Sequence, residues 1–368
     1  MDAQMKQNSM TQKGISMRQI ILTLLALTFS PTARFLATYA SEDAKQAAWL
    51  LPFFTFPFLL FFFYVMQKTF QKHPDACYMD IISQVTGKVA GTAIVALYFI
   101  WLVLHNALCG RFFAEKLITT LYTGVDIRVF LIAMLVVVAL AMHYGIIAIA
   151  RMGELVLFGL VLNFCVYIFF MSGDIDIKFL TPITYRDFVP VAKGSISQGS
   201  IWGNAVFLFF FSEKIYNKNK IMKTGFNGSL FLLLATATLI ISIVGVLGYR
   251  LAAMSPHAFI NAANQIEVGN VLEKIESLLI TIWIASDFIA LSVFSYVSLR
   301  MLVWILGIKD EKPFINIFLV LMFFLILLAG RNQVELNAFC RVGNAVNVLY
   351  GFAVPALILG IGKLRRVL

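Results

Sequence analysis

The residues of this sequence that could do chemistry are a few polar side chains within long apolar stretches. In a bilayer such side chains are costly, and they face the interior of a helix bundle or a cavity. We expect a small ligand to be bound by Thr28, Ser30, Thr32, Tyr98, His105, Ser200, Trp202, Gly203 and Asn204. A gate or ion-linked group is expected at Arg34, Ser286 and Asp287.

The composition excludes soluble classes of protein. Hydrophobic residues make up 60% of the 368 residues and charged residues 13%, whereas soluble domains are roughly half apolar and about a quarter charged. The net charge of +10 is explained by basic residues that fix membrane topology, so we expect contact with lipid and not with nucleic acid. The four widely spaced cysteines are interpreted as small buried hydrophobic residues. No enzyme motif is present, and neither a cofactor nor a metal site is expected.

Ten charge-poor segments are candidates for membrane spans. We therefore predict an all-α integral membrane protein whose single transmembrane domain covers residues 1–368. Lysine and arginine gather on one side of these segments, which predicts that both termini are cytoplasmic. The segments lie near residues 17–40, 46–66, 90–118, 129–148, 153–172, 195–212, 225–250, 272–306, 313–330 and 341–362.

Three further segments call for a local interpretation. The first span could be mistaken for a signal peptide, but Pro31 and Arg34 interrupt it, so we expect it to be retained. Residues 73–88 have an amphipathic pattern that ends at Gly87, which predicts a short helix along the cytoplasmic surface. Residues 255–270 are moderately apolar, and both a capping or re-entrant loop and a plain solvated loop fit them.

The first span contains a proline near its middle. Pro31 lacks a backbone donor and clashes with the preceding turn, whereas Ser30 is a good N-cap for a helix that starts at a proline. The pattern predicts two half-helices, the second of which begins at Pro31. A proline kink in a continuous helix is the alternative.

The sixth span has a matching irregularity. Gly199, Ser200, Gly203 and Asn204 concentrate backbone freedom in its first half, and Asn204 is a fair N-cap for a restarting helix. Broken helices at corresponding positions of two halves are typical of transporters with inverted repeats. We therefore predict a five-plus-five inverted repeat, with repeat one near residues 17–172 and repeat two near 190–330 plus the later helices.

The two predicted breaks suggest how a ligand is held. Each restarting half-helix would aim its N-terminus at the membrane midplane, which suits a carboxylate. Open carbonyls near Leu27, Thr28 and Ile201 would suit an ammonium group. This geometry predicts a zwitterion such as an amino acid.

Several polar residues have two interpretations. His105 could be a pocket or proton-linked group, or it could hydrogen-bond between helices. Asp287 could pair with Arg34, coordinate a cation or lie nearer the outer boundary. Arg34 could act as an extracellular gate or as part of a structural ion pair.

Several short motifs, in order along the chain, resemble those of the spore-germination permease family, a branch of the amino acid–polyamine–organocation transporter superfamily. The resemblance covers nearly the whole chain. One departure is Ser30-Pro31, where many relatives have glycine, and another is Lys274, where arginine is usual. The motifs are Ile15–Ile20, Ala48–Leu50, Arg111–Glu115, His143–Glu154 with its Arg151, Phe179–Ile183, and Leu272–Ser277 followed by Trp283.

The resemblance implies the membrane-embedded B subunit of a nutrient germinant receptor in the spore inner membrane. It implies a small nutrient, often an amino acid, bound between spans one, three, six and eight, and complexes with an A subunit and a lipoprotein C subunit. Two other functions remain open. One is an active secondary amino acid transporter coupled to protons or sodium, and the other is an ion or water conduit within the receptor assembly.

Overall fold

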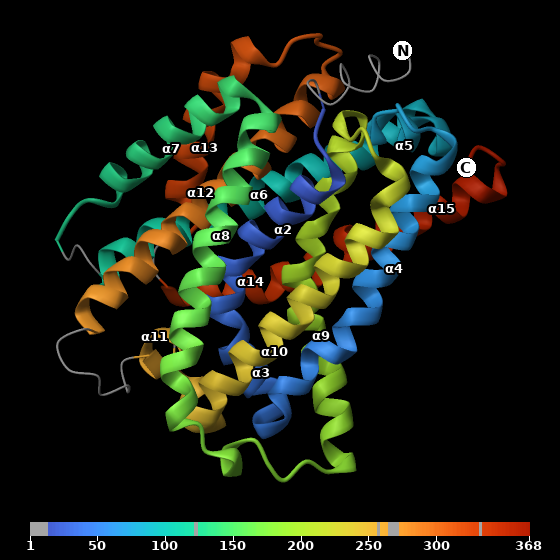
Figure 1. The fold of residues 1–368 in the computed structure, drawn as a ribbon. Coiled ribbons are helices and arrows are strands. Elements are labelled where there is room, and N and C mark those ends of the chain that lie inside the picture. The colour runs from blue at the N-terminus through green and yellow to red at the C-terminus, as the bar shows by residue number, and fades with distance from the viewer. Residues whose placement is uncertain (1–13, 121–123, 256–257, 264–271, 331–332) are drawn as a thin grey trace, which may run out of the picture.

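The computed structural model describes residues 14–120, 124–255, 258–263, 272–330 and 333–368, and they are almost entirely helical (Figure 1). All ten predicted segments are occupied by helix. The main helices in chain order are α2 (Met17–Pro31), α3 (Ala37–Ala44), α4 (Leu51–Lys72), α5 (Tyr78–Thr86), α6 (Lys88–Thr120), α7 (Ile127–Tyr144), α8 (Ile146–Met171), α9 (Phe188–Gly203), α10 (Ile221–Met254), α11 (Ala258–Ala263), α12 (Leu272–Ile305), α13 (Ile315–Leu328), α14 (Gln333–Val348) and α15 (Val354–Leu364).

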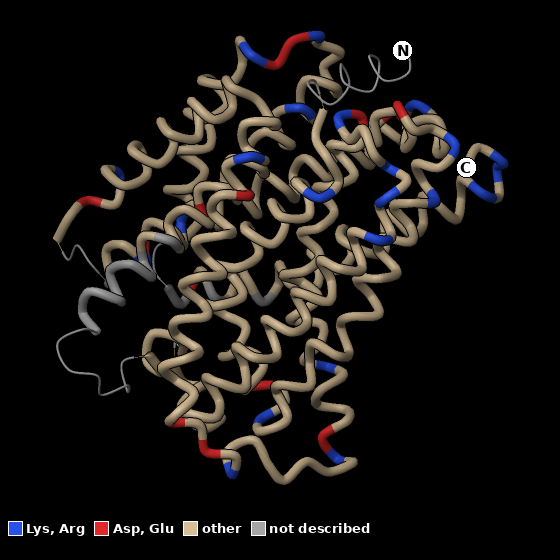
Figure 2. The backbone as a smooth tube through the Cα atoms, in the orientation of Figure 1, with Lys and Arg blue, Asp and Glu red and all other residues tan. Residues whose placement is uncertain are grey.

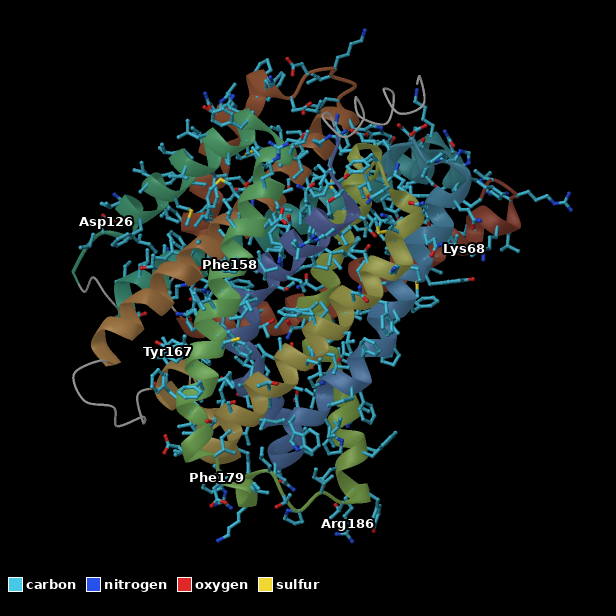
Figure 3. All side chains as sticks on the ribbon, in the orientation of Figure 1. Lys68, Asp126, Phe158, Tyr167, Phe179 and Arg186 are labelled. Carbon is cyan, nitrogen blue, oxygen red and sulfur yellow. The ribbon has the colours of Figure 1, made fainter. Side chains whose placement is uncertain are left out.

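Seven helical stretches of the described chain are long and apolar enough to cross a membrane, and one of them, Met17–Lys72, covers the first two predicted spans. The predicted all-α membrane protein is thereby confirmed. Its long helices expose apolar side chains, such as Phe158 on α8, which is 75% exposed (Figure 3). Charged residues gather at the two ends of the bundle, and lysine and arginine are densest at the end that carries α5 and α15 (Figure 2).

Helices α2 and α12 lie in the interior of the bundle. Helix α12 packs against α2, α6 and α8, while α10 packs against α3 and α4. Helix α9 packs against α4 and α14. These contacts bring the first, third, sixth and eighth predicted spans around a common centre, to which the last span, α14, is added.

The chain does not break into two half-helices at Pro31, and that prediction is wrong. Helix α2 includes Pro31 and continues into a π-helical stretch, η1 (Thr32–Leu36), before α3 begins. The wider turn accommodates the proline without unwinding the backbone. The hydroxyl of Thr32 donates to the carbonyl of Thr28 at 2.6 Å, and the Thr28 hydroxyl donates to that of Leu24 at 2.8 Å. These hydroxyls add hydrogen bonds to carbonyls on either side of Leu27, whose own carbonyl lacks the N–H that a residue other than proline would supply at position 31.

The sixth span is irregular at the predicted place but in another form. Helix α9 ends at Gly203, and η6 (Asn204–Lys214) continues as a 3-10 helix. Asn204 therefore does not cap a restarting α-helix. Its backbone N–H donates to the carbonyls of Ile201 and Trp202, so the chain remains helical through the junction.

Two of the predicted connecting elements lie in described residues. Helix α5 ends at Thr86 and is followed by Gly87, whose φ of 92° is in the left-handed region that favours glycine. The amphipathic helix predicted within 73–88 is thus confirmed. In the segment 255–270, residues 258–263 form α11, and Phe259 of that helix is buried against Tyr167 and Trp283. This part caps the bundle, while residues 256–257 and 264–270 lie outside the described residues.

The cysteines differ from the prediction that they are buried. Cys165 is exposed on α8, and Cys77, Cys109 and Cys340 are partly buried. Burial and the charge of Glu213 raise the pKa of the Cys77 thiol, which lies before α5, to about 12. This thiol is neutral at physiological pH.

A glycine pair lets α9 approach the last span closely. A Cβ at Gly351, in the π-helical stretch η10 (Leu349–Ala353), would lie 2.6 Å from the Cα of Gly203. A Cβ at Gly203 would lie 2.8 Å from the carbonyl oxygen of Asn347. Both contacts are with backbone atoms, which cannot move aside as a side chain can.

We expect Gly351→Ala to lower the free energy of unfolding by about 1–3 kcal/mol through overpacking. Gly360→Ala is the matched control, because a Cβ there meets nothing within 4 Å. Thermal unfolding of both variants in detergent micelles measures the difference. Equal melting temperatures for the two variants would contradict the close backbone approach.

Candidate functional site

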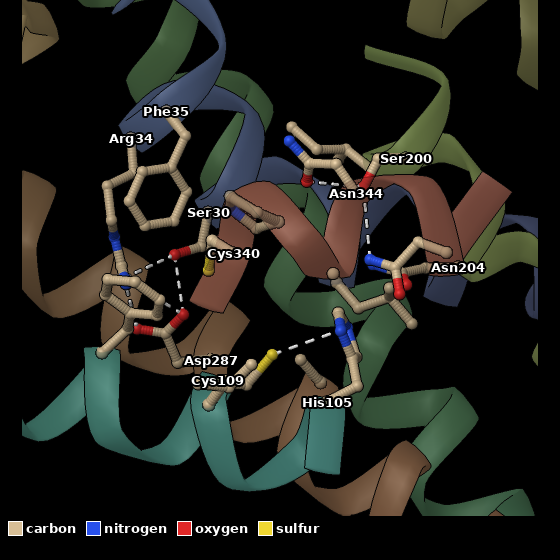
Figure 4. A pocket seen from close by; sticks show the side chains of 18 of the residues that line it. Ser30, Arg34, Phe35, His105, Cys109, Ser200, Asn204, Asp287, Cys340 and Asn344 are labelled. Atoms are coloured by element: carbon tan, nitrogen blue, oxygen red, sulfur yellow. Dashed lines mark hydrogen bonds and ion pairs between the residues drawn. The ribbon is translucent and has the colours of Figure 1, made fainter. Parts of the chain in front are cut away.

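A cavity of about 90 Å³ lies between α2, η1, α6, α9, α12 and α14 (Figure 4). This volume has room for several water molecules or one small organic molecule. Its polar lining is divided between a cationic wall on α2, η1 and α12 and an amide wall on α9, η6 and α14. The lining residues are Leu27, Ser30, Pro31, Arg34, Phe35, Tyr39, His105, Leu108, Cys109, Phe112, Ser200, Ile201, Asn204, Asp287, Ala290, Phe294, Cys340, Gly343, Asn344 and Asn347.

The cationic wall is built around the carboxylate of Asp287. Its Oδ2 atom lies 2.8 Å from Nζ of Lys116 and 3.1 Å from Nη2 of Arg34. Its Oδ1 atom accepts a hydrogen bond from the Ser30 hydroxyl at 2.7 Å. Arg34, Lys116 and Asp287 are all at least nine-tenths buried. Because charges at membrane depth must be paired, this cluster fixes the register of three helices.

Two further hydrogen bonds join α2 to α12 beside the cluster. The Ser286 hydroxyl donates to the carbonyl of Ala26 at 2.6 Å and accepts from the backbone N–H of Ser30 at 3.3 Å. The Arg34 guanidinium also lies 5.3 Å from the centre of the Phe35 ring and 5.9 Å from that of Phe112. Aromatic faces stabilise a cation at such distances, so the apolar neighbours support the buried charge.

The amide wall is a hydrogen-bonded chain between α9, α14 and α6. The Ser200 hydroxyl donates to Oδ1 of Asn344 at 2.9 Å and accepts from Nδ2 of Asn347 at 3.2 Å. Oδ1 of Asn347 in turn accepts from the Trp101 indole N–H at 2.7 Å. Oδ1 of Asn204 is buried and has no hydrogen-bond partner. A buried acceptor in this state is costly, which makes Asn204 a natural contact for a donor in the cavity.

His105 lies on the floor of the cavity, 3.7 Å from Sγ of Cys109 (Figure 4). Its ring stacks near Trp101 and meets Phe294 edge-on. Within the described residues, no three His, Cys, Asp or Glu side chains are arranged to hold a metal ion.

The structure brings together six of the residues proposed from sequence, and six others lie elsewhere. Thr28 and Thr32 bond to the backbone of their own helix, and Ser286 joins two helices. Gly203 serves the close contact with Gly351. The six that line the cavity are Ser30, Arg34, His105, Ser200, Asn204 and Asp287, and the six that do not are Thr28, Thr32, Tyr98, Trp202, Gly203 and Ser286.

The alternatives left open for three of these residues can now be compared with the geometry. Asp287 pairs with Arg34, which is one of the three alternatives given for Asp287, and Lys116 also pairs with this carboxylate. Arg34 is accordingly part of a buried ion cluster. His105 lines the cavity and contacts Cys109 on its own helix.

Sequence reasoning missed Lys116, Asn344 and Asn347. Lys116 lies inside the third predicted span, and a lysine at that depth is a signal for a buried partner. The two asparagines are three residues apart in the tenth span and so share one face of a helix. The hydrogen-bond partners of these asparagines belong to helices distant in sequence, and therefore no local sequence pattern identifies the two asparagines as site residues.

The carbonyls expected to hold an ammonium group are in part used by the chain itself. The Thr28 carbonyl accepts from the Thr32 hydroxyl and backbone N–H, and the Ile201 carbonyl accepts from the Asn204 N–H. The prediction failed for these two carbonyls because the helices stay wound. Helical continuation consumes carbonyls that a true break would leave open.

Aromatic side chains fill the space between the cavity and the end of the bundle that carries α5. Tyr98 belongs to this cluster, with ring centres 5.4 Å from Phe210 and 4.9 Å from Tyr350. Tyr78 of α5 lies 4.6 Å from Phe209. We call the following residues the inner aromatic cluster: Phe62, Phe70, Tyr78, Tyr98, Phe207, Phe209, Phe210 and Phe211.

An ion pair and a backbone bridge hold this end together. Nη2 of Arg300 on α12 lies 2.6 Å from Oε1 of Glu213 at the end of η6. The N–H of Ile15 donates to the carbonyl of Lys214, and Asn217 accepts from the N–H of Met17. In this conformation these contacts join the first, sixth and eighth spans to one another on the α5 side of the cavity.

The ion cluster makes a prediction about stability. We expect Asp287→Asn to lower the free energy of unfolding by about 3–5 kcal/mol, because it leaves buried cations uncompensated. Adding Lys116→Met should restore part of the loss, so the double variant costs less than the two single variants together. Chemical unfolding in micelles measures the cycle. Asp126→Asn, whose pair with Arg128 is exposed, is the control and should change stability little. Strict additivity of Asp287→Asn and Lys116→Met would rule out the coupling.

Comparison with a solved transporter shows the fold. The substrate-bound outward-open state of a Na⁺-coupled sialic acid symporter matches with a TM-score of 0.60 and 10% sequence identity, covering 96% of this chain and 79% of that chain. At this identity the likeness concerns the arrangement of helices and carries no statement about substrate.

Comparisons of sequence show the family. Spore germination protein KB of Bacillus subtilis (strain 168) is 23% identical over 292 residues, which cover 78% of this chain and 77% of the relative. The family model described as spore germination protein matches residues 14–334, which include five helices that form the cavity and Lys116 beside it. The resemblance seen in the motifs is thus confirmed, and the chain belongs to the spore germination permease family.

Proposed function

We propose that this chain is the germinant-sensing membrane subunit of a spore nutrient receptor and binds an amino acid or a similar small nutrient in the cavity. The observation that carries this proposal is the position of the cavity against the buried Asp287 cluster. A ligand there contacts Arg34 and Asn204, which belong to opposite walls. Membership of the family supports the germination role.

The cluster offers a means of passing a signal. Arg34, Lys116 and Asp287 belong to three different elements, η1, α6 and α12. A ligand that binds Arg34 more tightly in one arrangement of these helices shifts the population toward that arrangement. Partner subunits then respond to the movement of the helices.

The proposed partners are an A-type subunit and a lipoprotein C-type subunit, and the proposed location is the spore inner membrane with both termini in the cytoplasm. The family supports the partners and the location. The concentration of lysine and arginine at the end that carries α5 and α15 supports the orientation (Figure 2).

A second candidate is an active secondary transporter of amino acids, coupled to protons or sodium, and the likeness to a symporter fold favours it. The inner aromatic cluster and the Arg300–Glu213 pair close the α5 side of the cavity in this conformation, a feature that a sensor and a transporter closed on one side share. Sensing is preferred because membership of the family supports the germination role. Buried aromatic rings leave no polar path toward the α5 side in this conformation, which disfavours an open ion or water conduit.

Reconstitution distinguishes these functions. We expect purified protein in proteoliposomes to show saturable binding of a labelled amino acid without accumulation, with or without a proton or sodium gradient. Protein-free liposomes are the control. Gradient-driven accumulation would contradict sensing as the sole function and favour the transporter, whereas ion leakage in the absence of ligand would favour the conduit.

Substitution at the amide wall tests the location of the site. We expect Asn204→Leu to abolish the rise in melting temperature that a bound ligand gives, because the apolar side chain removes a polar contact from the cavity. Ser197→Ala is the control, because Ser197 lies on the same helix, does not line the cavity and contacts Asp43 instead. Unchanged stabilisation of the Asn204 variant would place the site elsewhere.

A further inference from the structure

The carboxylate of Asp287 is already occupied. Its two oxygen atoms receive the Lys116 ammonium, the Arg34 guanidinium and the Ser30 hydroxyl at distances from 2.7 to 3.1 Å. A ligand ammonium would have to displace one of these buried donors. Since breaking a buried ion pair is strongly unfavourable, Asp287 is a poor partner for a cationic group.

The Arg34 guanidinium has an N–H donor that makes no hydrogen bond within the protein. Its hydrogen bonds to Ser30 and Asp287 all come from Nη2. Nε is buried and has no hydrogen-bond partner. The side chain is only 4% exposed, yet it lines the cavity. A guanidinium carries five N–H donors in a rigid fork that matches a carboxylate. The cavity therefore has a buried place for a negative charge.

The rest of the lining is neutral. Among the described residues that line the cavity, Asp287 is the single carboxylate. The buried amide oxygen of Asn204 has no partner, and two of the three carbonyls expected to receive an ammonium, those of Thr28 and Ile201, are bonded within the chain. An uncharged hydroxyl satisfies a neutral amide oxygen, whereas an ammonium also has to be stripped of water without a counter-charge.

We propose that the cavity selects small carboxylates whose second polar group is an uncharged donor, such as a hydroxyl, over zwitterionic amino acids. The ligand carboxylate binds Arg34, and its hydroxyl donates to Asn204. This inference rests on the sensing site proposed above and changes the chemical class of its ligand.

Three probes of equal carbon number separate the contributions. L-lactate has a carboxylate and a hydroxyl, L-alanine has a carboxylate and an ammonium, and propane-1,2-diol has no charge. Calorimetric titration of the full chain in detergent micelles at neutral pH measures their affinities. We expect lactate to bind about tenfold or more tightly than alanine, because the ammonium of alanine loses its water without a counter-charge in the cavity. We expect the diol not to bind.

A conservative variant links the preference to Arg34. Arg34→Lys keeps a positive charge beside Asp287 but removes the fork, so we expect lactate affinity to fall about tenfold or more. Arg128→Lys is the control for the same exchange, because Arg128 is exposed and does not line the cavity. The melting temperature without ligand verifies that each variant is folded.

Tighter binding of alanine than of lactate would overturn the inference and leave the sensing function intact. Binding of the diol as tight as that of lactate would overturn it by showing that charge is not read, and so would an unaltered affinity in Arg34→Lys. Absence of binding by all three probes would also overturn it. Gradient-driven uptake of lactate would support the ligand class and contradict the sensing function.

Discussion

The carboxylate of Asp287 is the constraint on which the centre of this protein depends. It lies within an apolar helix and is shared by an arginine from the first span and a lysine from the third. Buried charges at this depth are stable only when they are paired with opposite charges. The first span, α6 and α12 therefore cannot slide or rotate independently. The same cluster forms one wall of the cavity. Structural order and the ligand recognition that we propose therefore use the same side chains.

The helices next to this cluster are irregular but remain wound. A proline in the first span is accommodated by a π-helical stretch, and the sixth span tightens into a 3-10 helix after Gly203. In lipid every backbone group needs a partner, and threonine hydroxyls together with continued helical bonding supply these partners. The consequence for the ligand is chemical. Fewer free carbonyls face the cavity than a true break would provide, so side chains carry more of the recognition that we propose.

The two sides of the cavity differ in the kind of contact that closes them. Toward α5 there is a thick layer of aromatic rings, backed by the Arg300–Glu213 ion pair. Along the cavity itself the contacts are hydrogen bonds between neutral amides and a few charges. Rings packed edge to face resist gradual opening, because close-packed interiors are bistable rather than continuously deformable. In the sensing mechanism that we propose, a small change at Arg34 therefore produces a discrete rearrangement of helices.

The sequence by itself determined that this is an all-α membrane protein, where its helices lie, and which family it resembles, because span length and apolar content are set locally by the bilayer. It also located both helix irregularities and half of the proposed cavity residues, since a polar side chain in an apolar segment is conspicuous. The division into two repeats remains a prediction. Only the tertiary structure decided the form of the irregularities, the place of Lys116 beside Asp287, and the roles of Asn344 and Tyr98. The contacts of Lys116, Asn344 and Tyr98 depend on partners more than a hundred residues away, and a helix pattern specifies a face without specifying what will meet it. The form of the irregularities depends on which donor reaches each backbone carbonyl, which the residue types alone do not specify.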